Sequence, residues 1–204
     1  MIAIIDYGLG NIQAFVNVYN RLGIPVTIAK TAESFETAHK LILPGVGAFD
    51  HAMELLNASG MRQTLDDLIL GKKVPVLGIC VGMQILANSS EEGALDGLGW
   101  IPGHVCAFKS APDVAALPLP HMGWNDVHVT CEHRLFKGIE EEVRFYFLHS
   151  YFFECMSRDA VIATASYGID FCCAVQSDNV YGVQFHPEKS HHFGTNLLKN
   201  FAEL

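Results

Sequence analysis

Short apolar runs alternate with helical patterns over the first half of the chain. The runs carry no charged residue, which is typical of strands buried on both faces of a sheet. Strands that alternate with helices predict right-handed crossovers and a parallel sheet covered on both faces. The expected strands are residues 1–5, 26–29, 41–43 and 74–79, and the expected helices are residues 11–22, 50–56 and 61–70.

Beyond Glu92 the pattern changes to several short strands. Residues 93–103 are rich in glycine and predict a loop, whereas residues 194–204 have the amphipathic pattern of a helix. Ser177-Asp178-Asn179 is a hairpin signal between two apolar runs. The expected strands here are residues 105–108, 127–130, 144–148, 161–165, 171–176 and 181–185, and residues 111–120, with three prolines, are expected to form a mobile loop.

Length and composition fit one domain with a sizeable core. The chain has 204 residues, half of them hydrophobic, and shows neither repeats nor a long linker. We therefore expect an α/β fold in a single domain, residues 1–204, with a mostly parallel central sheet flanked by helices.

Net charge and cysteine spacing indicate which partners and which cellular compartment to expect. A formal net charge of −9 disfavours nucleic acid and anionic membranes as partners. The six cysteines form no C-x-x-C pair and no disulfide-framework spacing. The N-terminal apolar run ends at Asp6, too early for a signal peptide, and no apolar stretch reaches the length of a membrane span. These features predict a soluble, reduced, cytoplasmic protein.

Cys80 lies where the apolar run of residues 74–79 changes to the helical pattern of residues 83–87. Gly78 and Gly82 flank it two positions away on each side, which is the G-x-nucleophile-x-G elbow with cysteine in place of serine. The glycines are needed because a Cβ would clash where strand and helix close up. The N–H groups and dipole of the following helix stabilise a thiolate, so the pattern predicts a nucleophilic cysteine.

These residue types also have other interpretations. A lone cysteine is ordinarily a small core residue, and only the paired glycines between a strand and a helix reverse that expectation for Cys80. Gly8 and Gly10 resemble the start of a dinucleotide loop, but Gln13 stands where the third glycine belongs. His191 and His192 could suggest a metal, yet adjacent residues on a strand point apart and no third ligand is evident, so we expect no metal site.

A nucleophilic cysteine needs a base, and the base needs an orienting group. His186-Pro187-Glu188 directly follows an expected strand. Proline favours an extended conformation for His186, and side chains two apart in an extended segment point the same way. His186 and Glu188 are thus the candidate base and its carboxylate, although the pair alone could equally be solvent-facing.

With these motifs in place, the chain resembles the class I, or triad-type, glutamine amidotransferases nearly from end to end. The resemblance rests on residues 78–84, Gly-Ile-Cys-Val-Gly-Met-Gln, and residues 182–188, Gly-Val-Gln-Phe-His-Pro-Glu. Within that class it resembles the glutaminase subunits of imidazole glycerol phosphate synthases. That second resemblance rests on residues 5–11, 43–49, 120–125, 148–151 and 187–190.

The resemblance implies a flavodoxin-like fold and a Cys80–His186–Glu188 triad that hydrolyses glutamine through a thioester. It implies an oxyanion hole made by the N–H of Val81 and a second N–H, from Val46 or Gly47, on the loop after a strand. Glutamine would be bound by Gln84, Glu92, His149, Ser150 and Tyr151. No cofactor or metal is implied.

The resemblance also implies an obligate partner, a (β/α)8-barrel cyclase in a heterodimer that receives the ammonia. Trp124, Asn125 and Lys189 would lie at that contact, although Trp124 could be a core aromatic and Lys189 a solvated surface lysine. Residues 190–194 also resemble paralogous subunits that supply ammonia to a sugar in surface-polysaccharide synthesis. A stand-alone cysteine hydrolase and a binding module with a decayed site are the rival classes; Gln84 and Glu92 argue against the first, and the intact triad argues against the second.

Overall fold

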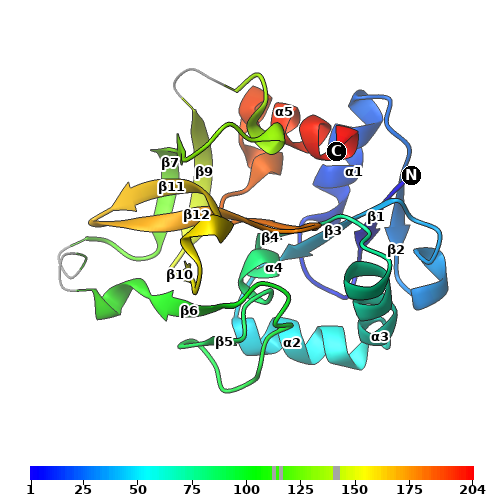
Figure 1. Ribbon diagram of the computed structural model, residues 1–204, viewed down its shortest axis with the longest axis horizontal. Coiled ribbons are helices and arrows are strands. Elements are labelled where there is room, and N and C mark those ends of the chain that lie inside the picture. The colour runs from blue at the N-terminus through cyan, green and yellow to red at the C-terminus, as the bar shows by residue number, and fades with distance from the viewer. Residues whose placement is uncertain (112–113, 115–116, 140–142) are drawn as a thin grey trace.

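One large sheet runs through the molecule. The computed structural model describes residues 1–111, 114, 117–139 and 143–204, and its main sheet has the strand order β2-β1-β3-β4-β13-β12-β10-β6-β5 (Figure 1). The strands in this order are β2 Val26–Ala29, β1 Ile2–Ile5, β3 Lys40–Gly45, β4 Val76–Cys80, β13 Val180–Val183, β12 Ile169–Ser177, β10 Tyr151–Cys155, β6 Gly103–Ala107 and β5 Ser89–Ser90.

The first half of this sheet is parallel. Each neighbouring pair from β2 to β13 is parallel, whereas β12 and β10 join it by antiparallel pairing. Two strands, β11 (Val161–Tyr167) and β8 (His128–Val129), extend the antiparallel part. A separate antiparallel ribbon is formed by β7 (His121–Asp126) and β9 (Arg144–His149). The predicted α/β fold with a mostly parallel central sheet is confirmed.

Helices cover both faces of the parallel part (Figure 1). On one face lie α1 (Ile12–Arg21) and α5 (His191–Glu203), which the hydroxyl of Tyr19 joins by a 3.2 Å hydrogen bond to the carbonyl of Leu198. The helices of the other face are α2 (Phe49–Ala58), α3 (Arg62–Asp66), which continues as a π-helical turn over Asp67–Gly71, and α4 (Val81–Gln84). Among the described residues, no helix is long and apolar enough to cross a membrane.

Burial explains why the apolar runs become strands. All four residues of β1 and all five of β4 are buried, as expected for strands covered on both faces. Along β9 buried and more exposed residues alternate, because one face of the ribbon packs on the core. Continuous apolar runs therefore mark the central strands, whereas β9 of the ribbon has alternating buried and more exposed positions.

Several local expectations were wrong. The helix after Cys80 begins at Val81 and ends at Gln84, because the carbonyls of residues 85–87 accept hydrogen bonds from the N–H groups of Leu98, Gly99 and Ile101 instead of continuing the helix. His191 and His192 begin α5 rather than lying on a strand. The sequence analysis did not anticipate β7 and β10. The loop expected over residues 111–120 lies partly outside the described residues and stays a prediction.

Candidate functional site

Cys80 ends β4 in a strained turn that leads directly into α4. Its backbone has φ 55° and ψ −115°, a positive φ in a residue other than glycine. The flanking glycines allow strand and helix to touch. A Cβ on Gly78 would lie 2.5 Å from the carbonyl oxygen of Gly82, and a Cβ on Gly82 would lie 1.9 Å from that of Leu43. The predicted elbow is therefore present, with both glycines required by close backbone contact.

His186 lies opposite this cysteine and is held by Glu188. Nδ1 of the imidazole is 3.0 Å from Oε1 of the carboxylate, and both side chains are almost completely buried. His186 is extended as predicted, with φ −102° and ψ 93°. Glu188, however, lies in a 3₁₀ turn, Pro187–Lys189, so the extended-segment argument for their common direction was wrong. The 3₁₀ turn, rather than an extended segment, places the carboxylate of Glu188 within hydrogen-bond distance of the His186 ring.

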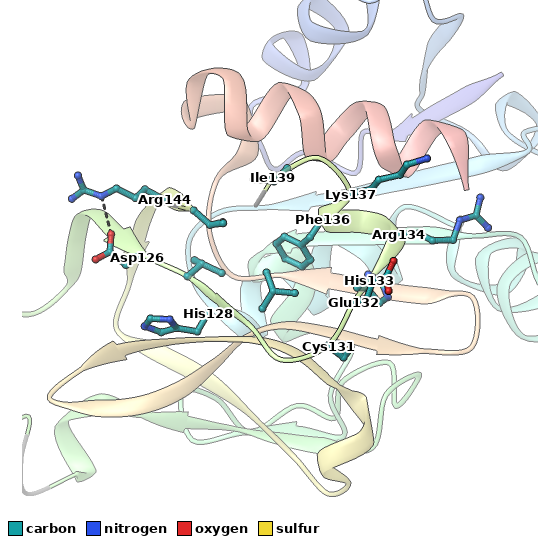
Figure 2. Close-up of a pocket in the computed structure, with 13 residues that line it drawn as sticks. Asp126, His128, Cys131, Glu132, His133, Arg134, Phe136, Lys137, Ile139 and Arg144 are labelled. Carbon is teal, nitrogen blue, oxygen red and sulfur yellow. Dashed lines mark ion pairs between the residues drawn. The ribbon is translucent and has the colours of Figure 1, made fainter. Parts of the chain in front are cut away.

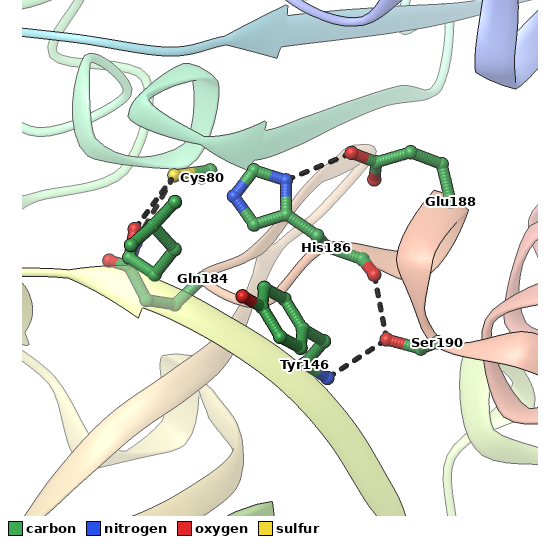
Figure 3. Close-up of polar contacts among 7 residues, drawn as sticks. Cys80, Tyr146, Gln184, His186, Glu188 and Ser190 are labelled. Atoms are coloured by element: carbon green, nitrogen blue, oxygen red, sulfur yellow. Dashed lines mark hydrogen bonds and ion pairs between the residues drawn. The ribbon is translucent and has the colours of Figure 1, made fainter. Parts of the chain in front are cut away.

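Ser190 fixes the backbone of the base. Its hydroxyl donates a 2.6 Å hydrogen bond to the carbonyl of His186 and accepts a 3.0 Å hydrogen bond from the N–H of Tyr146 on β9 (Figure 3). The N–H of His186 in turn donates to the carbonyl of Tyr146. These three bonds tie His186 to β9 and limit the movement of its ring.

The surroundings of His186 favour a protonated imidazole. Burial lowers its pKa, but the hydrogen bonds to Cys80 and Glu188, together with their charges, outweigh burial and raise the pKa to about 10. Within the described residues, Oε2 of Glu188 is buried without a hydrogen-bond partner, so the imidazolium is the main compensation for that charge. Figure 3 shows the ring between the sulfur and the carboxylate.

Two further groups contact the sulfur. The thiol of Cys80 lies 3.9 Å from the carbonyl oxygen of Leu148, and Nε2 of Gln184 lies 3.8 Å from the sulfur. Gln184 is completely buried, and its Oε1 accepts a 3.1 Å hydrogen bond from Gln84. Sequence analysis did not select Gln184, although an amide inside the apolar run of residues 181–185 is a signal that could have found it.

A pocket of about 290 Å³ opens at the sulfur. It contains every predicted nucleophile, base, oxyanion and glutamine-binding residue, whereas Glu188 lies behind His186. Its lining residues are Val46, Gly47, Cys80, Val81, Gln84, Glu92, Pro120, Leu148, His149, Ser150, Tyr151, His186 and Lys189.

Strand register explains why the loop after β3 reaches the cysteine. Gly45 pairs with Cys80 in the parallel β3–β4 ladder, so Val46 and Gly47 follow immediately beside the sulfur. A Cβ on Gly45 would lie 2.5 Å from the nitrogen of Gly82, which fixes this close approach. Gly47, in contrast, has φ +91° and no atom within 4 Å of the position of its missing Cβ, so no close contact of the kind made at Gly45 holds it in place.

Glu92 is the acidic residue in the pocket lining. Oε2 of Glu92 accepts a 2.8 Å hydrogen bond from the N–H of Phe49, the first residue of α2. Burial raises the pKa of Glu92, this backbone bond lowers it, and the nearby Asp50 raises it. A carboxylate placed here suits a substrate that carries an ammonium group.

The residues predicted for a partner contact lie beside the pocket on one surface. Trp124 is 39% exposed and stacks on His191 with 5.3 Å between ring centres. Lys189 is exposed at the pocket rim, with Nζ 5.7 Å from the centre of the Tyr146 ring. Asn125 differs, because its carboxamide faces inward and bonds to the carbonyl of Ser166 at 2.8 Å.

A second, larger hollow lies away from the cysteine, below α5 (Figure 2). Residues 126–129, 131–134, 136–137, 139 and 143–144 line it, and an exposed ion pair joins Arg144 to Asp126 at 2.9 Å. None of the predicted site residues reaches it. Over the described part of the chain, no three His, Cys, Asp or Glu side chains gather as they would around a metal ion.

Comparisons with known proteins place this geometry in a family. The family model "Glutamine amidotransferase class-I" matches residues 3–204. Proteins named imidazole glycerol phosphate synthase subunit HisH are 63% identical in Bdellovibrio bacteriovorus and 52% identical in Leptospira interrogans, each over 204 residues that cover all of both chains.

Solved structures match the fold at low identity. A structure titled glutamine amidotransferase has a TM-score of 0.75 at 20% identity, over 99% of this chain and 97% of that one. A glutamine amidotransferase from Thermotoga maritima has a TM-score of 0.63 at 17% identity, over 99% and 82% of the two chains. The chain belongs to the class I glutamine amidotransferase family.

Proposed function

We propose that this chain is the glutaminase subunit of an imidazole glycerol phosphate synthase, which hydrolyses glutamine and passes the ammonia to a partner subunit. The observation that carries the proposal is that Cys80 and His186 line one pocket while Glu188 contacts the far side of the His186 ring. The chain that holds them is 63% identical along its whole length to a protein of that name. The Leptospira interrogans relative bears the same subunit name, and a Pseudomonas aeruginosa relative is named imidazole glycerol phosphate synthase subunit HisH 2.

Cys80 and His186 divide the chemistry between them. The thiol gives its proton to Nε2 of His186, and the sulfur attacks the side-chain carboxamide carbon of glutamine. The resulting tetrahedral intermediate collapses to a glutamyl thioester, and the imidazolium returns the proton to the departing nitrogen, which leaves as ammonia. Neutral His186 then takes a proton from water, whose oxygen attacks the thioester carbon. The C–S bond breaks, the sulfur takes the proton back from His186, and glutamate and the thiol are released.

The raised pKa of His186 supports the first half of this cycle. An imidazole whose pKa is about 10 accepts the thiol proton readily and keeps it until the leaving group needs it. Glu188 holds Nδ1 and leaves Nε2 for the sulfur side, which is the arrangement of an orienting carboxylate. Glu188 is therefore proposed to orient and stabilise rather than to transfer a proton.

The oxyanion of the intermediate needs two N–H donors. The N–H of Val81 is one, because Val81 is the first residue of α4 and is fixed by the helix start. We assign the other to Val46 or Gly47, which adjoin the sulfur through the β3–β4 register. Because Gly47 permits rotation, this donor points inward only when the partner is bound, and the control acts on kcat.

Glutamine would lie along the rest of the pocket. The carboxylate of Glu92 suits its α-ammonium group, and Gln84 together with residues 149–151 surrounds the remainder. Gln84 donates through Nε2 to the carbonyl of Tyr151 and to Gln184, which leaves its Oε1 as the acceptor available to a ligand. This set favours free glutamine over a peptide substrate.

The partner is proposed to be a (β/α)8-barrel cyclase, with the pair acting in the cytoplasm. Trp124 and Lys189 offer it an exposed aromatic and a cation beside the pocket mouth. Asn125 would contribute through its backbone, since its carboxamide bonds inward.

Complementation tests the acceptor. Cells that lack their own glutaminase subunit of the synthase should grow without histidine when this chain is expressed with its cognate cyclase, and should not grow with Cys80→Ala. Failure to grow, alongside a working glutaminase, would contradict the histidine-pathway acceptor and favour a sugar as in the polysaccharide paralogues.

A further inference from the structure

Two buried histidines face each other across the β7–β9 ribbon. His121 and His149 are a paired position of the two strands, and their side chains lie in contact. Nδ1 of His121 is 3.0 Å from Nε2 of His149, and the residues are 4% and 5% exposed. Neither is part of the triad, and His121 does not reach the pocket.

The end near the pocket fixes the proton positions of His149. Nδ1 of His149 lies 2.8 Å from the carbonyl oxygen of Tyr151, which can only accept, so Nδ1 carries a hydrogen. In the neutral ring Nε2 must then be the acceptor. His121 therefore donates to it from its own Nδ1.

The contacts of Asn125 with His121 give the same proton positions independently. Asn125 donates from Nδ2 to the carbonyl of Ser166, and its Oδ1 accepts from the N–H of Asp126, so the orientation of its carboxamide is fixed. Its Nδ2 lies 3.2 Å from Nε2 of His121, which must be an acceptor. All these bonds point the same way, from Asn125 through His121 and His149 to Tyr151.

The environment keeps both rings neutral. A proton added to either would set two N–H groups against each other, and the walls around them are mostly aromatic. Burial lowers the pKa of His121 to about 4 and that of His149 to about 3; the bond to the carbonyl of Tyr151 raises the pKa of His149, and His121 and His186 lower it further. The rings that surround the pair are Phe108, Phe147, Tyr167 and Phe171.

The same carbonyl connects the pair to the nucleophile. The oxygen of Tyr151 also accepts a 3.2 Å hydrogen bond from Nε2 of Gln84. Gln84 donates its second hydrogen to Oε1 of Gln184, and Gln184 in turn contacts the sulfur of Cys80. An unbroken series of polar contacts thus runs from β7 to Cys80.

We propose that His121 is a positioning residue for the glutamine pocket: acting through His149, it fixes the carbonyl of Tyr151 and thereby the direction of the Gln84 carboxamide. The proposal rests on the proposed glutaminase function. Gln84 and Tyr151 line the pocket and contact bound substrate before and during the reaction alike, so the effect falls on KM for glutamine rather than on kcat.

Kinetics of the complex with the cyclase test this role. His121→Phe keeps the aromatic packing and removes both polar contacts, whereas His121→Gln keeps one donor and one acceptor. We expect His121→Phe to raise KM for glutamine about tenfold with kcat within about twofold, and His121→Gln to restore most of the loss. His128→Phe, at an exposed histidine on β8, is the matched control and should behave as wild type. An unchanged KM, or a fall in kcat alone, would overturn the proposal.

Nitrogen-15 NMR of the imidazoles in the full chain provides a second readout that does not depend on glutaminase activity. Wild type should show two histidines protonated at Nδ1 and not titrating between about pH 5.5 and 8. In both His121 variants thermal unfolding should stay cooperative, and in His121→Phe the Nε2 signal of His149 should shift, because the N–H that His121 donates to it is gone. Rings that titrate near pH 6.5 or carry the hydrogen on Nε2 contradict the positioning role. A chain with these NMR signatures but without glutaminase activity would instead contradict the proposed function.

Discussion

Oε1 of Glu188 lies 3.0 Å from Nδ1 of His186. The backbone changes conformation between the two residues, since His186 is extended and Glu188 lies in the following 3₁₀ turn. Both side chains are buried, so the pair is shielded from solvent and its geometry is set by Pro187 and Ser190. Because Glu188 contacts Nδ1 and leaves Nε2 to face the sulfur, we assign proton transfer to His186 and orientation of its ring to Glu188.

Removing the base should damage catalysis more than removing the charge of the carboxylate. General acid–base catalysis is worth roughly 10²–10⁴ in rate, so His186→Ala should lose about that much in kcat. Glu188→Gln keeps the imidazole and should lose less. Steady-state glutaminase rates of both variants in the complex decide the question, and equal or reversed losses would mean that the two roles are misassigned.

The same pair predicts a titration. The proton that His186 takes from the thiol of Cys80 should stay on the imidazole at pH 8 and leave near pH 10, because the partners that raise its pKa outweigh burial. Glu188→Gln removes one of these partners, so the pKa should fall and the ring should be neutral at lower pH. NMR of the His186 ring measures both values, and Glu203→Gln, at an exposed ion pair with Lys199, is the control that should leave the titration unchanged.

The elbow predicts a contrast between two glycines. A Cβ at Gly82 would meet the carbonyl of Leu43, so Gly82→Ala should destabilise the fold by about 1–3 kcal/mol or more and displace α4 from Cys80. Gly71 has open space around its missing Cβ, so Gly71→Ala should be neutral or stabilising by up to about 1 kcal/mol. Denaturant unfolding measures the difference. If the two variants were equally stable, the close contact would not constrain this turn.

Tyr7 predicts a separate effect on the oxyanion loop. Its buried hydroxyl donates a 2.8 Å hydrogen bond to the carbonyl of Pro44, directly before Gly45 and the proposed donors. Tyr7→Phe should cost about 0.5–1.5 kcal/mol of stability and lower kcat without raising KM. Tyr19→Phe removes a comparable buried hydrogen bond, to Leu198, far from the pocket, and should lose stability alone. Equal kcat values for the two variants would argue against control of the loop by Tyr7.

The open space around Gly47 predicts activation by the partner. If one oxyanion donor points away in the free chain, kcat should rise by roughly 10²–10³ when the cyclase and its ligand bind, with little change in KM. Glutaminase kinetics of the chain alone, with the cyclase, and with the cyclase plus its ligand measure this. If the chain alone already had the kcat of the complex with ligand, the proposal that an oxyanion donor points away in the free chain would be wrong.

Much of the site was predictable because its chemistry is local in sequence. The glycines around Cys80 and the proline after His186 fix backbone geometry directly, so a short motif suffices to locate them. The central strands were predictable for a similar reason, since burial on both faces leaves continuous apolar runs.

What the sequence did not reveal depends on contacts between distant segments. Gln184 contacts the sulfur of Cys80 and the carboxamide of Gln84 on α4, and His121 contacts His149 on β9. No spacing along the chain encodes these contacts. The short α4 ends where the carbonyls of the next residues, 85–87, accept from the distant N–H groups of Leu98, Gly99 and Ile101. Strand β10 follows β9 after Ser150 without a glycine or proline to mark the break. Glu188 contacts the ring of His186, although the extended conformation expected for the glutamate was wrong.

The most direct test of the account is synthesis by the complex with Cys80→Ala, supplied either with glutamine or with ammonium salt. Cys80 is the only group proposed to form a bond to glutamine, whereas the acceptor reaction is proposed to belong to the cyclase. The account predicts that glutamine-dependent synthesis is abolished while ammonia-dependent synthesis stays near the wild-type rate. A variant that still releases glutamate from glutamine at an appreciable rate would show that Cys80 is not the nucleophile.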